Sequence, residues 1–326
     1  MDPHLLTTFV TVARHGSFSA AASELGYTQS AISQQIAALE ADLGLPLLRR
    51  RPVEPTPAGR RLLEHAGPLL LRLRAARADV LRAAAGPRHR LRLAATPLAL
   101  NPVLAARLAR ARARQPRLEV RLHTCGREQV TAMVADGRAD LGLADGVVAP
   151  SDPLRLPDAG PMTATGVTEE ELVVVLPGDH PLAGRAALRL ADLVDARWLQ
   201  TPLCPLARLR DLVGEGFPVG MEYAGDDVHT VVNLAAAGHG LTLLPASAVP
   251  ASASAVPASA SAVPASASAV PASASAVRAE APEPSRVRGR ACGVPLASPR
   301  LVHRVELLHG ALPAGAAADL AEALSG

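Results

Sequence analysis

The stretch from Ser17 to Leu43 constrains this chain most, because it predicts two short helices joined by a tight turn at Gly26 and Tyr27. Apolar residues in the second helix recur at spacings of four, three and four, one stripe at the helical period: Ile32, Ile36, Leu39 and Leu43. Another face carries small polar side chains. Such a face suits the major groove of DNA, where glutamine can bridge adenine N6 and N7. The residues expected at DNA are Thr28, Gln29, Ser30, Ser33 and Gln34. The alternative is a polar, solvated helix face.

The flanking segments predict the rest of a DNA-binding domain over residues 1–60. Apolar residues between Leu5 and Ala13 mark a first helix that ends near Gly16, and Ser17 and Thr28 are the expected N-caps of the next two helices. Three short helices with small turns are the minimum unit of a helix-turn-helix domain. The residues LPLLRRRPVEPTPAG then predict two short extended pieces around a turn, a β-wing. Its arginines would meet phosphates or the minor groove: Arg49, Arg50 and Arg51.

A long linker helix is expected over residues 56–86. Thr56-Pro57 places an N-cap residue before a proline at the first helical position. Pro68 should kink this helix without ending it, and Gly86-Pro87 should end it. Apolar residues recur at spacings of four, three, four, three and four, a coiled-coil seam that predicts pairing of two subunits. The alternative is packing on the same chain's core. The predicted dimerisation residues are Leu62, Ala66, Leu69, Leu73, Ala76 and Val80.

From Leu91 onward the pattern becomes α/β. The first five segments read strand, helix, strand, helix, strand, which implies parallel strands with right-handed crossovers. They are LRLAAT, PVLAARLARARARQP, LEVRLHT, EQVTAMVADGRA and DLGLA. Further strands are expected at ELVVVLP, WLQTP, LTLLP and LVHRVELLHG, and helices near ADLVD, from about Asp227 to Ala237, and over AAADLAEALSG.

One segment breaks this pattern, because VPASASA repeats four times from Val249 to Ala276. Its only larger residue is a valine next to proline, so the repeat carries no amphipathic heptad, and its four prolines oppose a helix. We expect a disordered or polyproline-like loop, either a repeat expansion tolerated at the surface or a tether for a partner.

Charge and cysteine content narrow the class of protein. Residues 1–90 hold 12 arginines against 7 acidic residues, a net charge of +5, and the remainder holds 21 against 23, a net charge of −2. A basic first third indicates an anionic partner for that part. Cys125, Cys204 and Cys292 have no metal-site or disulfide spacing, so a reducing compartment and no metal or cofactor are expected. Without a signal peptide or an apolar run of about 18 residues, a cytoplasmic protein with no membrane partner is predicted.

The chain resembles the LysR-type transcriptional regulators in the order of its helices, wing and linker helix. The resemblance is specific in LLTTFVTVARHGSFSAAASELGYTQSAISQQIAALEADLGLPLLRR and the following PTPAG, and weaker in HPLA at residues 180–183 and AAAGHGLTLLP ending at Pro245. It implies a winged helix-turn-helix, a dimerising linker helix and an effector region similar to periplasmic binding proteins. That region would have two α/β lobes, two crossover strands and a ligand cleft, and members usually act as dimers of dimers.

The resemblance also implies boundaries within the effector region, residues 91–326. Lobe 1 would hold about 91–166 and 292–326, and lobe 2 about 167–291 with the repeat inside it. The chain departs from the family pattern in its wing, which reads LLRRR where many relatives have an aromatic residue after the leucine. The linker-helix proline and the late repeat insert are two further departures.

Four residues at strand ends are the candidates for effector binding: Thr96, Thr124, Thr201 and Pro202. Thr96 follows the first strand of the α/β region, where we expect the start of a helix whose free N–H groups favour an anion such as a carboxylate. Ligands of open α/β sheets also bind beyond the carboxyl ends of strands. The alternative for Thr96 is a simple N-cap. Cys204 could line the same cleft or sense oxidants, the alternative being a buried structural thiol.

These observations predict a sequence-specific transcriptional regulator that acts as a homodimer or tetramer. A small effector would change the placement of the DNA-binding pairs, and so DNA bending or contact with RNA polymerase. An enzyme is the second class, but the α/β region has no G-x-S-x-G, P-loop, G-x-G-x-x-G or H-E-x-x-H motif. An architectural DNA-binding protein without an effector is the third.

Overall fold

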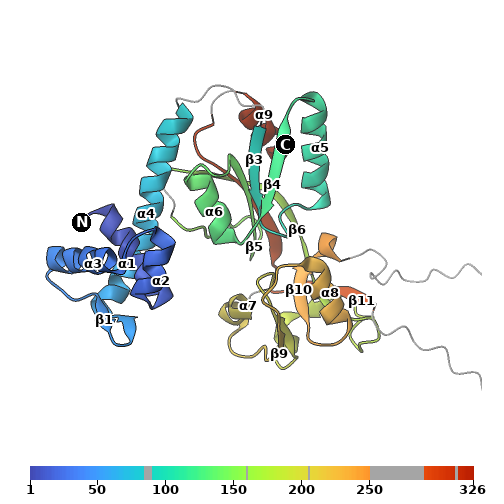
Figure 1. Ribbon diagram of the computed structural model, residues 1–326. Coiled ribbons are helices and arrows are strands. Elements are labelled where there is room, and N and C mark those ends of the chain that lie inside the picture. Colours follow the sequence, from blue (N-terminus) through green and yellow to red (C-terminus); the bar gives the residue numbers. More distant parts are fainter. Residues whose placement is uncertain (84–89, 159–160, 205, 250–289, 313–314) are drawn as a thin grey trace, which may run out of the picture. The chain divides into compact units, whose positions relative to one another are not determined.

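The computed structural model describes residues 1–83, 90–158, 161–204, 206–249, 290–312 and 315–326. They divide into two units (Figure 1). Unit 1 holds Met1–Asp145, Pro153–Thr168 and Val305–Gly326, and unit 2 holds Gly146–Asp152 and Glu169–Arg304. The VPASASA repeat after Val249 and the expected helix end at Gly86-Pro87 lie outside the described residues.

The first three helices begin where side chains cap them. They are α1 (Pro3–His15), α2 (Phe18–Leu25) and α3 (Gln29–Leu43). The predicted caps are confirmed: the Ser17 hydroxyl accepts the N–H of Ala20 at 3.2 Å, and the Thr28 hydroxyl accepts that of Ala31 at 3.2 Å. Gly16 ends α1 in the left-handed conformation, at φ 59°, which costs glycine little because it has no Cβ.

The apolar stripe of α3 holds these helices together. Ile32, Ile36 and Leu39 are completely buried, and they share one cluster with Phe9 of α1 and Leu47. Leu43 continues the stripe in sequence but is 39 % exposed, since it is the last residue of α3 and lies outside this cluster. Burial of the stripe leaves the opposite side of α3 uncovered.

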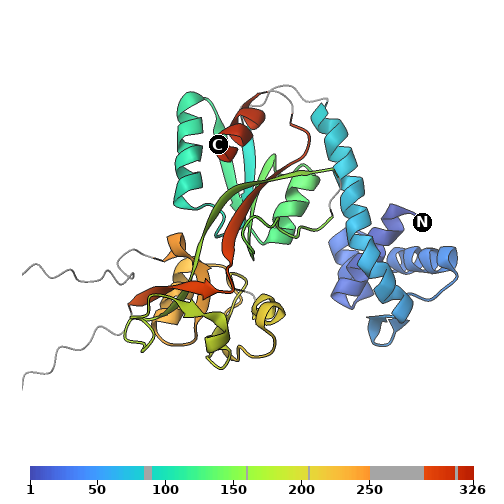
Figure 2. The same cartoon turned by 180° about the vertical axis from the view of Figure 1, so that it is seen from behind.

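The predicted wing is present. Strands β1 (Leu48–Arg50) and β2 (Val53–Pro55) pair antiparallel. The helix α4 (Pro57–Ala83) follows, and the Thr56 hydroxyl caps it by accepting the N–H of Gly59 at 3.0 Å. As predicted, Pro68 does not end this helix, which is the long blue-to-cyan helix seen along its length in Figure 2.

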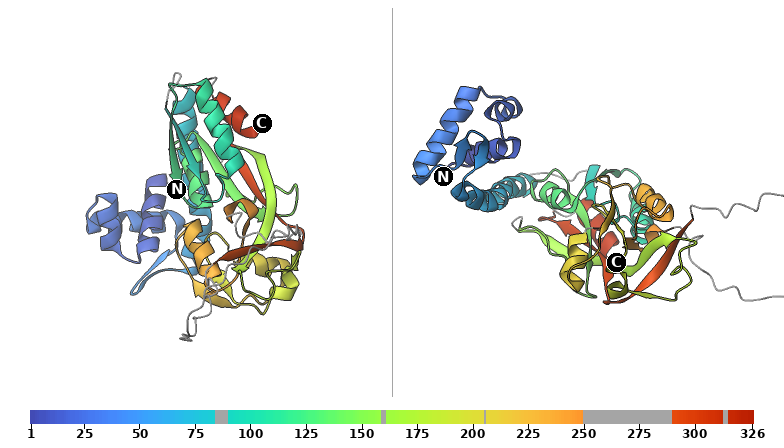
Figure 3. Two further views of the ribbon diagram at one scale, coloured as in Figure 1. Left: turned by 90° about the vertical axis from the view of Figure 1, so that its right-hand side faces the viewer. Right: turned by 90° about the horizontal axis from the view of Figure 1, so that it is seen from below.

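The α/β part of unit 1 begins with three parallel strands, as the sequence predicts. They are β3 (Arg90–Ala95), β4 (Glu119–Thr124) and β5 (Leu141–Val148), and β3 lies between the other two. The sheet order continues from β5 to β12 (Val302–His309) and β6 (Thr163–Pro177). Helices α5 (Pro102–Arg114) and α9 (Ala316–Ser325) share a hydrophobic cluster on this sheet and lie side by side (Figure 3). Helix α6 (Arg127–Ala135) packs closely on β5, where a Cβ at Gly142 would come within 2.7 Å of Val134.

Unit 2 is built around the last part of β6. Strands β10 (Thr242–Pro245) and β11 (Ala291–Ser298) pair with β6 antiparallel. Strand β7 (Leu188–Arg189) joins β11, and β8 (Trp198–Gln200) pairs parallel with β9 (Val219–Glu222). The helices are α7 (Leu206–Val213) and α8 (Val228–Ala236).

The helix expected near residues 191–195 is only a 3-10 turn, Leu190–Leu193. Strands β7, β9 and β11 and helix α7 lie where no element was predicted.

The core of unit 2 centres on Trp198. Its ring meets that of Phe217 edge-on, with centroids 5.5 Å apart, and its indole N–H donates to the carbonyl of Leu193 at 3.1 Å. Both aromatic side chains are completely buried.

Strands β6 and β12 each have residues in both unit 1 and unit 2. Within the described residues, no helix is long and apolar enough to span a membrane.

Gly59 should be the most sensitive position of the wing–helix junction. A Cβ built there would lie 2.1 Å from the carbonyl oxygen of Leu47, so Gly59→Ala must displace backbone. Overpacking of this kind costs about 1–3 kcal/mol of the free energy of unfolding. Calorimetry of the full chain measures this loss.

Gly67→Ala is the control in the same helix, because no atom lies within 4 Å of its Cβ position. We expect a change below about 1 kcal/mol, since the helix-propensity gain and the restriction on a residue before proline oppose each other. Equal losses in the two variants would contradict the packing assignment.

Candidate nucleic-acid interface and effector region

The predicted DNA-reading residues of α3 share one uncovered surface. Gln29, Ser30 and Gln34 are exposed, and Ser33 is half-buried. The hydroxyl of Thr28 lies 3.0 Å from that of Ser30 and is already used as the helix cap. Chemically, the surface offers amide and hydroxyl groups with little bulk.

The neighbouring Gln35 has a different role, which the sequence did not indicate. Its Oε1 accepts the hydroxyl of Thr8 at 2.6 Å, which ties α3 to α1. Of these two adjacent glutamines, Gln34 therefore lies on the outer surface and Gln35 is bonded to another helix of the domain.

The three predicted wing arginines differ in how they are held. Arg49 and Arg51 are exposed and have no hydrogen bond or ion pair within the described part of the chain. Arg50 lies 4.0 Å from a carboxylate oxygen of Glu40, and its guanidinium is 5.3 Å from the centroid of the Phe18 ring. Two of the three cations are thus free for phosphate.

Glu40 connects the wing to α3, and the sequence patterns did not reveal it. Its Oε1 accepts the backbone N–H groups of Leu47 at 2.7 Å and of Leu48 at 3.1 Å. A carboxylate that accepts two N–H groups makes stronger hydrogen bonds than a neutral acceptor. The start of β1 is therefore fixed to the C-terminal half of α3.

The six residues of the predicted dimerisation seam do not share one environment. Ala66 is completely buried and Leu62 partly buried against the core of α1–α3, so the alternative of packing on the chain's own core describes these two. Leu69, Leu73 and Val80 are 41 %, 50 % and 72 % exposed, and Ala76 is exposed as well. An apolar row therefore remains uncovered on α4 after Ala66.

Thr96 lies at the carboxyl end of β3, as predicted, but it is not at a helix start. Helix α5 begins at Pro102, and its cap is Asn101, which accepts the N–H of Leu104 at 3.0 Å. Thr96 is 4 % exposed; its hydroxyl accepts the N–H of Asp145 at 3.1 Å and lies 3.4 Å from the carbonyl of Leu143. Thr96 thus ties β3 to β5. The Asn101-Pro102 pair is the sequence signal that marks the true helix start.

The other effector candidates fall in both units. Thr124 ends β4 beside the end of β3, where the N–H of Cys125 donates to the carbonyl of Ala95 at 3.0 Å, and its side chain is exposed. Thr201, in unit 2, is buried, and its hydroxyl accepts the N–H groups of Leu203 and Cys204 at 3.1 and 3.2 Å. Pro202 is exposed. Thr96 and Thr124 are brought to one edge of the sheet in unit 1.

The thiol of Cys204 is buried, and this burial raises its pKa, an effect only partly opposed by the N–H of Leu243, 3.4 Å from the sulfur. A raised pKa means little thiolate at neutral pH, and the thiolate is the reactive form.

Within the described ranges, no group of three or more His, Cys, Asp or Glu side chains could hold a metal ion.

Two family models match the chain in the order of these regions. The model described as a bacterial regulatory helix-turn-helix protein of the lysR family matches residues 3–60. The model described as the LysR substrate binding domain matches residues 84–282.

Relatives that match about three quarters of the chain carry the names of regulators. A probable hydrogen peroxide-inducible genes activator of Mycobacterium avium is 35 % identical over 261 residues, 76 % of this chain and 79 % of that protein. A small neutral protease regulatory protein of Streptomyces coelicolor is 32 % identical over 74 % of this chain and 73 % of its own length. The HTH-type transcriptional regulator CatR of Pseudomonas putida is 31 % identical over 76 % and 83 %.

Solved structures agree on the fold. Full-length BenM is 23 % identical, with a TM-score of 0.50 over 99 % of this chain and 95 % of that chain. Full-length CbnR in complex with its target DNA is 20 % identical, with a TM-score of 0.50 over 99 % of each chain. A helix-turn-helix region followed by a substrate-binding region, both matched in order, makes this chain a member of the LysR family of bacterial transcriptional regulators.

Proposed function

We propose that this chain regulates transcription from a dyad-symmetric DNA site, read by the α3 surfaces and wings of two subunits, in response to a small-molecule effector. The observation that carries the proposal is the exposed polar surface of α3 beside two wing arginines, Arg49 and Arg51, that lack partners among the described residues. Glutamine and serine supply base-edge hydrogen bonds, and the arginines supply sequence-independent contact with phosphates.

Pairing through α4 supplies the second half of the site. The exposed residues Leu69, Leu73, Ala76 and Val80 keep spacings of four, three and four, which suits a helix–helix seam. A single α3 surface has few polar groups with which to discriminate a sequence. Two copies related by a twofold axis would read two half-sites, so the discrimination of the two surfaces would combine.

The effector is proposed to contact the carboxyl edge of the sheet in unit 1. Thr124 is exposed there, Thr96 fixes the ends of β3 and β5, and α6 starts at Gly126 without a side-chain cap. Uncapped N–H groups at a helix start favour an anion, so a carboxylate is the proposed class. Thr201 and Pro202, which belong to unit 2, are further proposed contacts of the effector.

The role proposed here is that of a cytoplasmic sensor without catalytic activity. The test uses the full chain, the DNA upstream of its own gene and a thermal-shift screen of small carboxylates. A saturable shift without turnover, together with a changed gel-shift pattern, supports the sensor. Turnover of a compound would favour an enzyme, and DNA binding that no compound alters would favour an architectural protein.

Gln34→Ala should weaken specific DNA binding by about 1–3 kcal/mol, because it removes a side chain that can pair bidentately with one base. Fluorescence anisotropy with operator and scrambled duplexes at one salt concentration measures the change. Binding to the scrambled duplex should stay the same.

Gln35→Ala is the matched control. It removes the hydrogen bond with Thr8, so it should lower the free energy of unfolding by about 1 kcal/mol and leave operator affinity unchanged at a temperature where the chain is folded. Equal affinities of the Gln34→Ala and parent chains would show that this surface does not read bases.

Leu73→Arg should separate the subunits. A leucine side chain buried in a seam contributes about 1.5–3 kcal/mol, and a guanidinium in its place adds a desolvation cost. Light scattering after gel filtration should show a smaller assembly, whereas the surface control Glu64→Arg should keep the parent mass. An unchanged mass for Leu73→Arg would contradict pairing through this row.

Cys204 should stay unmodified in the folded chain at pH 7.5. Burial raises the pKa of its thiol, so the thiolate is scarce below that pKa and the sulfur is inaccessible to reagents. Mass spectrometry after iodoacetamide or hydrogen peroxide should find modification of this residue only in urea. Rapid modification of the native chain would instead favour peroxide sensing, since the Mycobacterium avium relative is named for hydrogen peroxide-inducible genes.

A further inference from the structure

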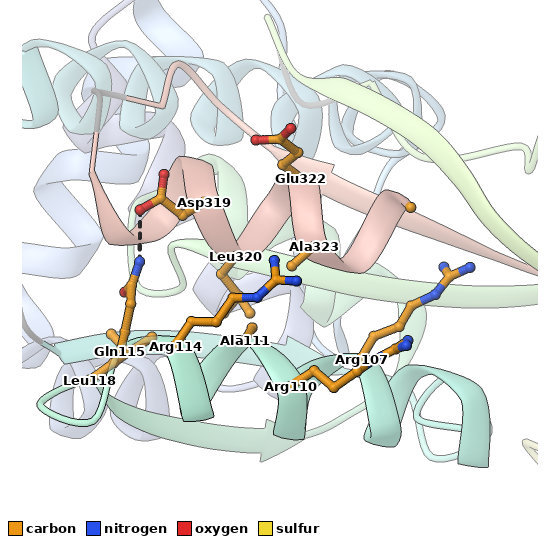
Figure 4. Close-up of a pocket in the computed structure, with 11 residues that line it drawn as sticks. Arg107, Arg110, Ala111, Arg114, Gln115, Leu118, Asp319, Leu320, Glu322 and Ala323 are labelled. Atoms are coloured by element: carbon orange, nitrogen blue, oxygen red, sulfur yellow. Dashed lines mark hydrogen bonds between the residues drawn. The ribbon is translucent and has the colours of Figure 1, made fainter.

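A groove of about 630 Å³ is lined by residues of helices α5 and α9 of unit 1 (Figure 4). None of the strand-end residues discussed above lines it, and its volume falls within the range of small-molecule sites. Its floor is apolar, formed by Ala111, Leu118, Leu320 and Ala323. Ala111, Leu118 and Leu320 are at most 8 % exposed, so this floor is the edge of the core beneath the two helices.

The wall formed by α5 is strongly basic. Five arginines and no acidic residue occur between Asn101 and Leu118, namely Arg107, Arg110, Arg112, Arg114 and Arg117. Of these, Arg107, Arg110 and Arg114 line the groove. Their spacing of three and four places them on one face of the helix, where like charges destabilise each other.

None of these three cations forms an ion pair with a carboxylate of the described residues, although Asp319 and Glu322 also line the groove. Arg107 is half-buried and donates to two backbone carbonyls, those of Val167 at 3.1 Å and Leu324 at 2.7 Å. Arg110 and Arg114 are exposed, and neither has a hydrogen bond or ion pair within the described ranges. The positive charge of the α5 wall is thus left to solvent or to a ligand.

The acidic residues of α9 are directed elsewhere. Asp319 accepts the side-chain amide of Gln115 at 2.7 Å, which closes one end of the groove. Glu322 points away from α5, whereas the guanidinium of Arg114 reaches toward α9 (Figure 4). A helix C-terminus favours cations and so accounts for Arg112 and Arg114. It does not account for Arg110, one turn before Arg114, or for Arg107, two turns before it, both of which line the groove.

We propose that the groove between α5 and α9 binds a compact anion, a carboxylate or phosphate group on a small molecule. The guanidinium groups of Arg110 and Arg114 would each pair with two oxygens, a geometry that carboxylates and phosphates both match. Arg107 adds positive charge at the inner end.

Isothermal titration of the full chain with inorganic phosphate and, separately, with citrate tests this proposal at constant ionic strength. The parent chain should bind at least one of them saturably, and the pair of titrations separates phosphate from carboxylate preference. The double variant Arg110→Gln, Arg114→Gln should weaken that binding at least about tenfold, or about 1.4 kcal/mol.

The double variant Arg112→Gln, Arg117→Gln is matched in charge and lies on the same segment, but neither residue lines the groove. It should bind the anion like the parent, and circular dichroism should show both double variants folded. Absence of saturable binding by the parent, or equal weakening in both double variants, would overturn the proposal. So would weaker duplex binding by the groove variant with unchanged anion binding.

Discussion

The DNA-binding region depends on one carboxylate, that of Glu40. It accepts two consecutive backbone N–H groups at the start of the wing, Leu47 and Leu48. Both N–H groups come from residues whose side chains are buried in the core of α1–α3. The apolar stripe of α3 sets which surface of the helix faces outward, and Glu40 sets where the arginine wing lies beside it. The exposed polar surface of α3 and the arginine wing are thereby held at a fixed separation.

The arginines of this chain fall into two structural classes. Some are held by protein groups, as Arg50 is by Glu40 and Phe18, or Arg107 by two carbonyls. Others, such as Arg49, Arg51, Arg110 and Arg114, have no partner in the described part of the chain. Other arginines without a partner in the described part of the chain lie elsewhere, among them Arg74, Arg77 and Arg208. Since an exposed guanidinium gains little from distant charges in water, the arginines of the wing and of the α5–α9 groove contribute little to stability, and their proposed role is to bind anions.

Structural features that depend on residues close together in the sequence were predicted well. Local patterns predict the N-caps Ser17 and Thr28, the end of α1 at Gly16 and the parallel order of the first strands.

Contacts between distant residues were not predictable in this way. The heptad spacing of α4 cannot tell a partner subunit from the chain's own core, and Ala66 packs on that core. Thr96 looked like a helix start because the five residues before Pro102 form a turn that has no periodicity. Strand β11 follows the repeat and is paired only through long-range contacts with β6 and β7.

The central claim is that two α3 surfaces, paired through α4, read DNA together. Hydroxyl-radical footprinting of the full chain on the DNA upstream of its own gene tests this claim most directly. Two protected half-sites should appear on one face of the duplex, with centres about 10–10.5 base pairs or a multiple of that distance apart. A single protected half-site, or uniform protection without sequence preference, would contradict the account.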